Sequence, residues 1–147
     1  MLKLYDAPFH MFMIDSAGTD AKLHGGKPTV SEQIFTGGVT YVLARGQWVK
    51  SPIDVVAIRN EAKKHMDEQK ATCAHIRDAA VNGETAAVWK VHSETEYGDS
   101  DTEAWISKSR NTLLRTDMYL DVGGALGKSH MVATYVYSNV QAPAGVK

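Results

Sequence analysis

The sequence lacks the features that mark several protein classes. Its single cysteine, Cys73, cannot form an internal disulfide, and we interpret it as a small buried apolar residue. A redox or intermolecular thiol is the alternative, but no Cys-x-x-Cys motif or adjacent activating charge supports it. No apolar run approaches the ~18 residues that a membrane-spanning helix needs, and no repeat or low-complexity segment is present. The 16 basic and 17 acidic residues give a formal net charge of −1, which argues against nucleic acid as a partner.

Patterns that carry catalysis or metal binding are also missing. None of the six histidines has the spacing of a metal-ligand motif. His92, His130 and Glu94 could be neighbours in one sheet, but we interpret them as ordinary polar-face residues. Residues 123–129 end in Gly-Lys-Ser, yet they lack the first glycine and the following helix of a phosphate-binding loop, so they predict a hairpin loop. We therefore predict no catalytic residue, no metal and no cofactor, and a protein that is not an enzyme.

What the sequence does contain is a succession of β-strands between residues 81 and 140. The dipeptide Asn82-Gly83 fits a type I′ hairpin turn, in which both central residues have positive φ. Side chains then alternate in character, as Trp89 and Val91 do with Lys90. Such alternation is typical of an antiparallel sheet with one apolar and one charged face. The expected strands are 72–81, 86–97, 103–107, 113–122 and 129–140, with a turn at 98–101.

Shorter strands are expected in the first 50 residues. Both faces of segment 9–14 are apolar, which predicts either a strand buried on two sides or an exposed edge strand that pairs with another subunit. Strands at 32–35 and 39–44 and a further hairpin at Trp48 bring the expected total to about seven. Residues 15–29 are expected to form a mobile loop.

One helix is expected after residue 50. Ser51 is a suitable N-cap, Pro52 suits the first helical position, and Asp54 favours the positive end of the helix dipole. Apolar residues then recur at helical spacing on one face to about residue 71: Val55, Ile58, Ala62 and Met66. The predicted fold is therefore a single α+β domain over residues 1–147. It comprises a curved antiparallel sheet of about seven strands, an open half-barrel, with one long helix on its concave face and a frayed tail at 142–147.

Two segments resemble the bacterial periplasmic lipoprotein-carrier superfamily. Residues 105–115 read Trp-Ile-Ser-Lys-Ser-Arg-Asn-Thr-Leu-Leu-Arg, and residues 135–140 read Tyr-Val-Tyr-Ser-Asn-Val. They are similar to that superfamily's strand-turn-strand signature, in which a Trp-Ile strand precedes a turn and then Leu-Arg. The turn departs from the pattern, because Arg-Asn-Thr-Leu replaces the usual Gly-Leu-Pro. The resemblance covers about residues 32–143, and it implies an exported domain with an apolar cleft for acyl chains and no catalysis.

The resulting prediction is a non-catalytic exported domain of lipoprotein-carrier type that binds an apolar or acyl ligand, such as a lipid, between helix and sheet. The expected cleft residues are Val55, Ile58, Met66, Trp89, Val91, Leu114, Met118 and Leu120. The same side chains could equally form an ordinary core without a ligand. The alternative function is a protein-interaction or structural envelope module that forms a homodimer through an edge strand. The N-terminal residues lack the apolar region of a signal peptide, so the periplasmic location rests on the resemblance alone.

Overall fold

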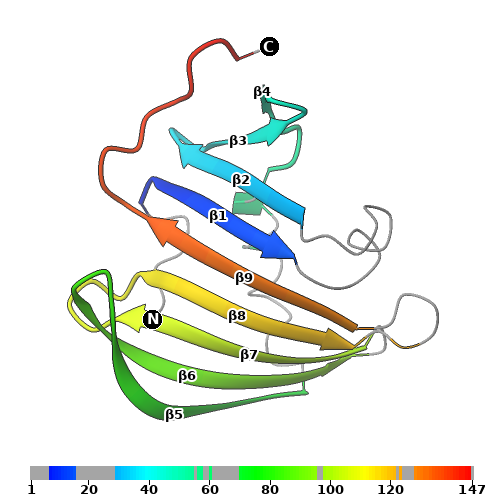
Figure 1. Ribbon diagram of the computed structural model, residues 1–147, viewed down its shortest axis with the longest axis vertical. Coiled ribbons are helices and arrows are strands. Elements are labelled where there is room, and N and C mark those ends of the chain that lie inside the picture. Colours follow the sequence, from blue (N-terminus) through cyan, green and yellow to red (C-terminus); the bar gives the residue numbers. More distant parts are fainter. Residues whose placement is uncertain are drawn as a thin grey trace.

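A curved, open, nine-stranded antiparallel sheet makes up the fold (Figure 1). The computed structural model describes residues 7–15, 29–54, 56, 57, 60, 70–95, 98–121, 123 and 128–146. The strands are β1 (Phe9–Asp15), β2 (Thr29–Thr36), β3 (Val39–Ala44), β4 (Gln47–Lys50), β5 (Lys70–Val81), β6 (Glu84–Thr95), β7 (Gly98–Ser107), β8 (Leu113–Asp121) and β9 (Lys128–Val136).

Two meanders join in the middle of the sheet. The strand order is β4-β3-β2-β1-β9-β8-β7-β6-β5, and β1 pairs with both β2 and β9. The two edges are therefore β4 and β5, which follow one another along the chain. Segment 51–69 must in consequence connect opposite edges of the sheet.

Positive backbone φ angles explain how three of the hairpins close. Asn82 and Gly83 have φ of 50° and 81°, so the predicted type I′ geometry between β5 and β6 is confirmed. The β2–β3 turn has two glycines with positive φ, and the β3–β4 turn uses Arg45 (φ 53°) before Gly46 (φ 78°). These tight turns join strands that follow each other directly and so favour the meander order.

The predicted α+β class is wrong. Within the described part of the chain the fold is all-β, with nine strands rather than about seven and no helix among its elements. Val56, Ala57 and Asn60 are helical, but residues 55, 58, 59 and 61–69 lie outside the described residues. The expected helix extended too far, because β6 runs to Thr95 and pairs with β5 back to Lys70.

Several smaller predictions are also corrected. Segment 9–14 is not an edge strand, because β1 pairs with β2 on one side and β9 on the other, and it is buried on one face only, since Phe12 and Ile14 are exposed. The turn expected at 98–101 lies inside β7, which starts at Gly98. Residues 16–28 of the expected mobile loop lie outside the described residues, while Asp15 ends β1 and Thr29 begins β2.

Two clusters of buried side chains form the core. One contains Phe9, Met11, Phe35 and Ala133, with Val56 packed against it. The Phe9 and Phe35 rings stack at 5.5 Å. We call the side of the sheet that carries this cluster the Phe9 face and the opposite side the His10 face, since side chains alternate between sides along a strand. The second cluster contains Ala86, Val88, Trp105 and Leu114.

Candidate functional site

Cross-strand register aligns the side chains of the Phe9 face into rows. One row runs from Met13 through Ala133, Thr116 and Ala104 to Trp89. The next row contains Met131, Met118, Thr102 and Val91, and a third contains Ser129, Leu120, Ser100 and Ser93. Because residues directly opposite each other in a ladder share a side of the sheet, all of these side chains lie on the Phe9 face.

The Phe9 face carries small side chains along β7. Ser100, Thr102 and Ala104 alternate along this strand, and we call these three residues the β7 strip. Larger apolar side chains flank the strip: Trp89 and Val91 on β6, and Met118 and Leu120 on β8. All seven residues are half-buried. Only Thr102 has a larger apolar residue on both sides, because Thr116 lies opposite Ala104 on β8 and Ser93 lies opposite Ser100 on β6.

Four of the eight residues predicted for the cleft come together on this face. They are Trp89, Val91, Met118 and Leu120. Leu114 instead belongs to the buried cluster around Trp105, because a bulge between β7 and β8 shifts the register there. Val55, Ile58 and Met66 lie outside the described residues.

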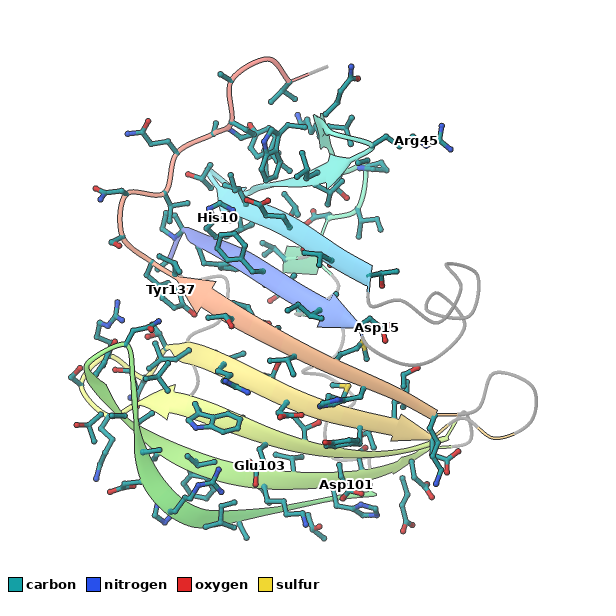
Figure 2. The ribbon with its side chains drawn as sticks, viewed as in Figure 1. His10, Asp15, Arg45, Asp101, Glu103 and Tyr137 are labelled. Carbon is teal, nitrogen blue, oxygen red and sulfur yellow. The ribbon has the colours of Figure 1, made fainter. Side chains whose placement is uncertain are left out.

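The His10 face of strands β6–β9 is charged, as the alternation predicted. Asp101 and Glu103 lie side by side along β7 (Figure 2). Each pairs with a basic side chain: His92 Nδ1 lies 2.8 Å from Asp101 Oδ1, and Arg77 donates to Glu103 at 3.0 Å. His130 Nε2 lies 2.6 Å from Asp117 Oδ1. These contacts make the face a network of partly exposed hydrogen-bonded pairs.

His92 faces a carboxylate at each of its ring nitrogens. Besides Asp101, Glu94 lies 3.2 Å from Nε2. Both ring nitrogens can donate a hydrogen bond at the same time only when the imidazole is protonated. These contacts, Asp101 first, therefore raise the pKa of His92 above 6.5. His92 and His130 lie on strands separated by β7 and β8, and no group of three His, Cys, Asp or Glu residues in the described ranges could hold a metal ion.

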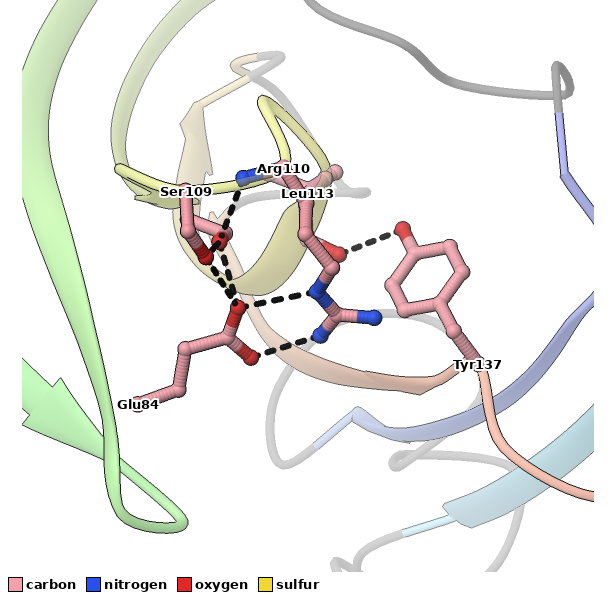
Figure 3. Close-up of polar contacts among 6 residues, drawn as sticks. Glu84, Ser109, Arg110, Leu113 and Tyr137 are labelled. Atoms are coloured by element: carbon pink, nitrogen blue, oxygen red, sulfur yellow. Dashed lines mark hydrogen bonds and ion pairs between the residues drawn. The ribbon is translucent and has the colours of Figure 1, made fainter.

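A network of polar side chains lies at one end of the sheet (Figure 3). Arg110, in the β7–β8 turn, donates from Nε to Glu84 Oε1 at 2.9 Å and from Nη2 to Glu84 Oε2 at 2.6 Å. The Ser107 hydroxyl also donates to Glu84, and Ser109 donates to it at 3.4 Å. We call these four residues the Glu84 network. Arg110 and then Ser107 lower the pKa of Glu84 from 4.5 to about 2, so the carboxylate is ionised at neutral pH.

Tyr137 joins this network to the end of β9. Its hydroxyl donates to the Leu113 carbonyl at 2.6 Å, and its ring lies 5.4 Å from the Arg110 guanidinium carbon. Tyr137 also packs against both buried clusters, and burial raises its pKa well above 10. Tyr137 therefore lies where the Phe9 face meets the Glu84 network.

The sequence analysis missed Glu84, Arg110 and Tyr137, although the meander order contains a signal for them. In an antiparallel meander every second turn lies at the same end of the sheet. The Asn82-Gly83 turn, the turn at Arg110 and the end of β9 therefore meet at one end. An acidic residue beside the first turn and an arginine in the second are then candidates for a pair.

Comparison with solved structures returns several distant matches. LprF from Mycobacterium bovis matches with a TM-score of 0.47 and 11% identity, over 93% of this chain and 88% of that chain. A LolA-superfamily protein from Nitrosomonas europaea matches with a TM-score of 0.26 and 9% identity, over 92% and 86%. A domain named for outer membrane lipoprotein sorting, from Vibrio parahaemolyticus, matches with a TM-score of 0.22 and 9% identity, over 99% and 89%.

At these TM-scores and identities the structural similarities carry no argument about ligand, activity or compartment. No protein-family model matches the sequence, and no curated protein matches it. Within the described ranges, no helix is long and apolar enough to cross a membrane. The function must therefore be argued from the residues of the sheet.

Proposed function

We propose that this chain is a non-catalytic carrier or binding domain for an apolar ligand such as an acyl chain, held on the Phe9 face along the β7 strip. The observation that supports this proposal is the run of small residues Ser100, Thr102 and Ala104 with the larger apolar side chains of Trp89, Val91, Met118 and Leu120 beside it on β6 and β8. The lining offers alkyl, aromatic and hydroxyl groups, which suit binding of an apolar molecule rather than a reaction.

The strength of such binding follows from the hydrophobic effect. Burying one methylene contributes ~0.8 kcal/mol, so about ten buried methylenes contribute on the order of 8 kcal/mol. Loss of translational and rotational freedom offsets several kcal/mol of this gain. We expect a dissociation constant in the micromolar range or weaker for a single acyl chain.

A fluorescent fatty acid titrated into the purified protein tests the proposal. Saturable uptake is expected, and Thr102→Phe should reduce it because the larger side chain fills the β7 strip. Glu103→Gln changes the adjacent residue on the opposite face and should leave uptake unchanged. Thermal unfolding of each variant checks that the sheet is intact. Absence of saturable uptake by the wild-type protein would show that these side chains form only an ordinary core.

The exported, periplasmic location is also a proposal, and it rests on the motif resemblance of residues 105–115. Reading the gene sequence upstream of Met1 would test it. A signal peptide encoded there is the expected result, and an upstream sequence that encodes no signal peptide would contradict the proposal.

Self-association is a second candidate function, and the free edge at β5 favours it. This edge strand spans 12 residues, and its side chains from Thr72 to Asp78 are exposed. Cys73 is among them, so the interpretation of Cys73 as a buried apolar residue is wrong. An exposed edge strand offers unpaired backbone groups to a second copy. Light scattering over a range of concentrations, with oxidation of Cys73 to trap β5–β5 pairs, should then show a dimer. A strict monomer without cross-linking would contradict this candidate.

A further inference from the structure

A cavity of about 170 Å³ lies beside the Glu84 network. It is lined by Val81, Asn82, Glu84, Arg110, Leu114, Tyr135, Val136, Tyr137 and Ser138. Apolar and polar side chains both contribute to this lining. A cavity of ~150 Å³ holds a benzene molecule, so this one accommodates a small polar group with a few carbons but not a whole acyl chain.

Arg110 presents unused hydrogen-bond donors beside this cavity. Its Nε and Nη2 atoms donate to Glu84, whereas Nη1 points away from Glu84 toward Tyr137 (Figure 3). No residue in the described part of the chain accepts a hydrogen bond from Nη1, which carries two N–H groups. Arg110 and Tyr137 both line the cavity, so these donors lie at its wall.

We infer that this cavity binds the carboxylate head group of an acyl ligand, with Arg110 Nη1 as a charge-assisted donor. The inference rests on the proposed function, since it assigns a place to the polar end of the same ligand. Asn82 and Ser138, whose side chains contain hydrogen-bond donors, also line the cavity. Glu84 also lines the cavity, but its two oxygens already accept hydrogen bonds from Arg110, Ser107 and Ser109, so Arg110 Nη1 is the charged donor left for an anionic head group.

Two tyrosines of β9 border both the cavity and the buried cluster around Phe9. Tyr135 and Tyr137 line the cavity and also pack against that cluster. Leu114 lines the cavity as well, and Thr116, two residues further along β8 and half-buried, lies opposite Ala104 of the β7 strip. We expect the chain of a ligand whose head group occupies the cavity to extend over Thr116 toward the strip.

Glu84 acts in this site as a positioning residue. Two hydrogen bonds hold the Arg110 fork in one orientation, and the lowered pKa of Glu84 keeps both partners charged at neutral pH. Because Glu84 occupies the Nε and Nη2 edge of the guanidinium, a ligand carboxylate is left with Nη1 as its donor.

Displacement of the neutral dye Nile red by single-chain amphiphiles tests this inference. Dodecanoate and dodecyltrimethylammonium have the same chain length but heads of opposite charge. For the wild-type protein we expect dodecanoate to bind at least tenfold more tightly. Arg110→Gln should lower the dodecanoate affinity about tenfold and leave dodecyltrimethylammonium unchanged.

Two further variants separate head-group binding from folding, because Arg110 also holds Glu84. Asn82→Gly retains the positive φ of the turn and the Glu84–Arg110 pair, and it should reduce only the dodecanoate affinity. Arg115→Gln, on the His10 face, is the matched control and should change neither affinity. Equal affinity of the wild-type protein for both amphiphiles overturns the head-group site, while saturable Nile red binding leaves the proposed function standing. Absence of saturable Nile red binding overturns both.

Discussion

Replacing Glu84 by glutamine should destabilise the fold in a pH-dependent way. The carboxylate accepts hydrogen bonds from Arg110, Ser107 and Ser109, and these contacts hold its pKa at about 2 instead of 4.5. That difference corresponds to about 3 kcal/mol of preferential interaction with the ionised form. The side chain is 25% exposed, and solvent screening lowers the net effect, so we expect a loss of about 2 kcal/mol at pH 7.

The direction of the pH dependence follows from the lowered pKa of Glu84. A carboxylate with a depressed pKa in the folded state stabilises the protein fully above its unfolded pKa, near 4.5. This contribution is lost as the pH falls from 4.5 toward about 2, where the folded-state carboxylate also takes up a proton. The stability difference between wild type and Glu84→Gln should therefore shrink over this window.

Urea unfolding of both proteins, followed by tryptophan fluorescence at several values between pH 7 and pH 2.5, measures this difference. Glu103→Gln is the matched control, because Glu103 also makes a two-bond pair with an arginine, Arg77, but is more exposed than Glu84, 34% against 25%, and accepts no serine hydroxyl within the described ranges. The stability that Glu103→Gln loses at pH 7 should be smaller than the stability that Glu84→Gln loses. A difference between wild type and Glu84→Gln that is near zero at pH 7, or that does not change with pH, would refute the reasoning.

Three further predictions follow from single positions. Gly83→Ala should cost about 1–2 kcal/mol in urea unfolding, because a left-handed backbone penalises a Cβ atom and Gly83 has φ of 81° with open space around it. The pKa of His92, measured by NMR, should lie above 6.5 and should fall in the Asp101→Asn variant. The stabilisation from this pair is therefore present below pH 6.5 and is lost as the pH rises through the folded-state pKa. An unchanged pKa of His92 in the variant would contradict this prediction. Leu114→Ala should lower the free energy of unfolding by about 2–4 kcal/mol because the Leu114 side chain is buried. Leu120→Ala should mainly weaken uptake of a fluorescent fatty acid, because Leu120 is half-buried. Loss of uptake in Leu114→Ala together with loss of stability in Leu120→Ala would contradict these roles.

β6, β8 and the second half of β7 could be predicted from the sequence because each signal there is local, whereas the turn expected at 98–101 belongs to the first half of β7. Asn82-Gly83 specifies its own turn geometry, and the alternation of Trp89 and Val91 with Lys90 identifies the two faces of β6. Four expected cleft residues share a face for the same reason.

Long-range pairing could not be read in the same way. The central place of β1 depends on its partners β2 and β9, which lie far apart in the sequence. The shift of Leu114 into the Trp105 cluster depends on a bulge, and a one-residue shift reverses the face of a side chain without a local signal. The apolar periodicity after Ser51 predicted a helix to about residue 71, and it could not reveal that β6 requires a partner strand from Lys70 onward.

The most direct test of the proposed function is to photo-cross-link an acyl ligand and map the labelled residues. A fatty acid with a diazirine in the middle of its chain would be irradiated with the protein, and the adducts located by mass spectrometry. The proposal predicts saturable labelling of Phe9-face residues on neighbouring strands, such as Trp89, Thr102 and Met118, which an excess of unlabelled dodecanoate prevents. Labelling confined to the His10 face, or labelling that dodecanoate does not reduce, would contradict it.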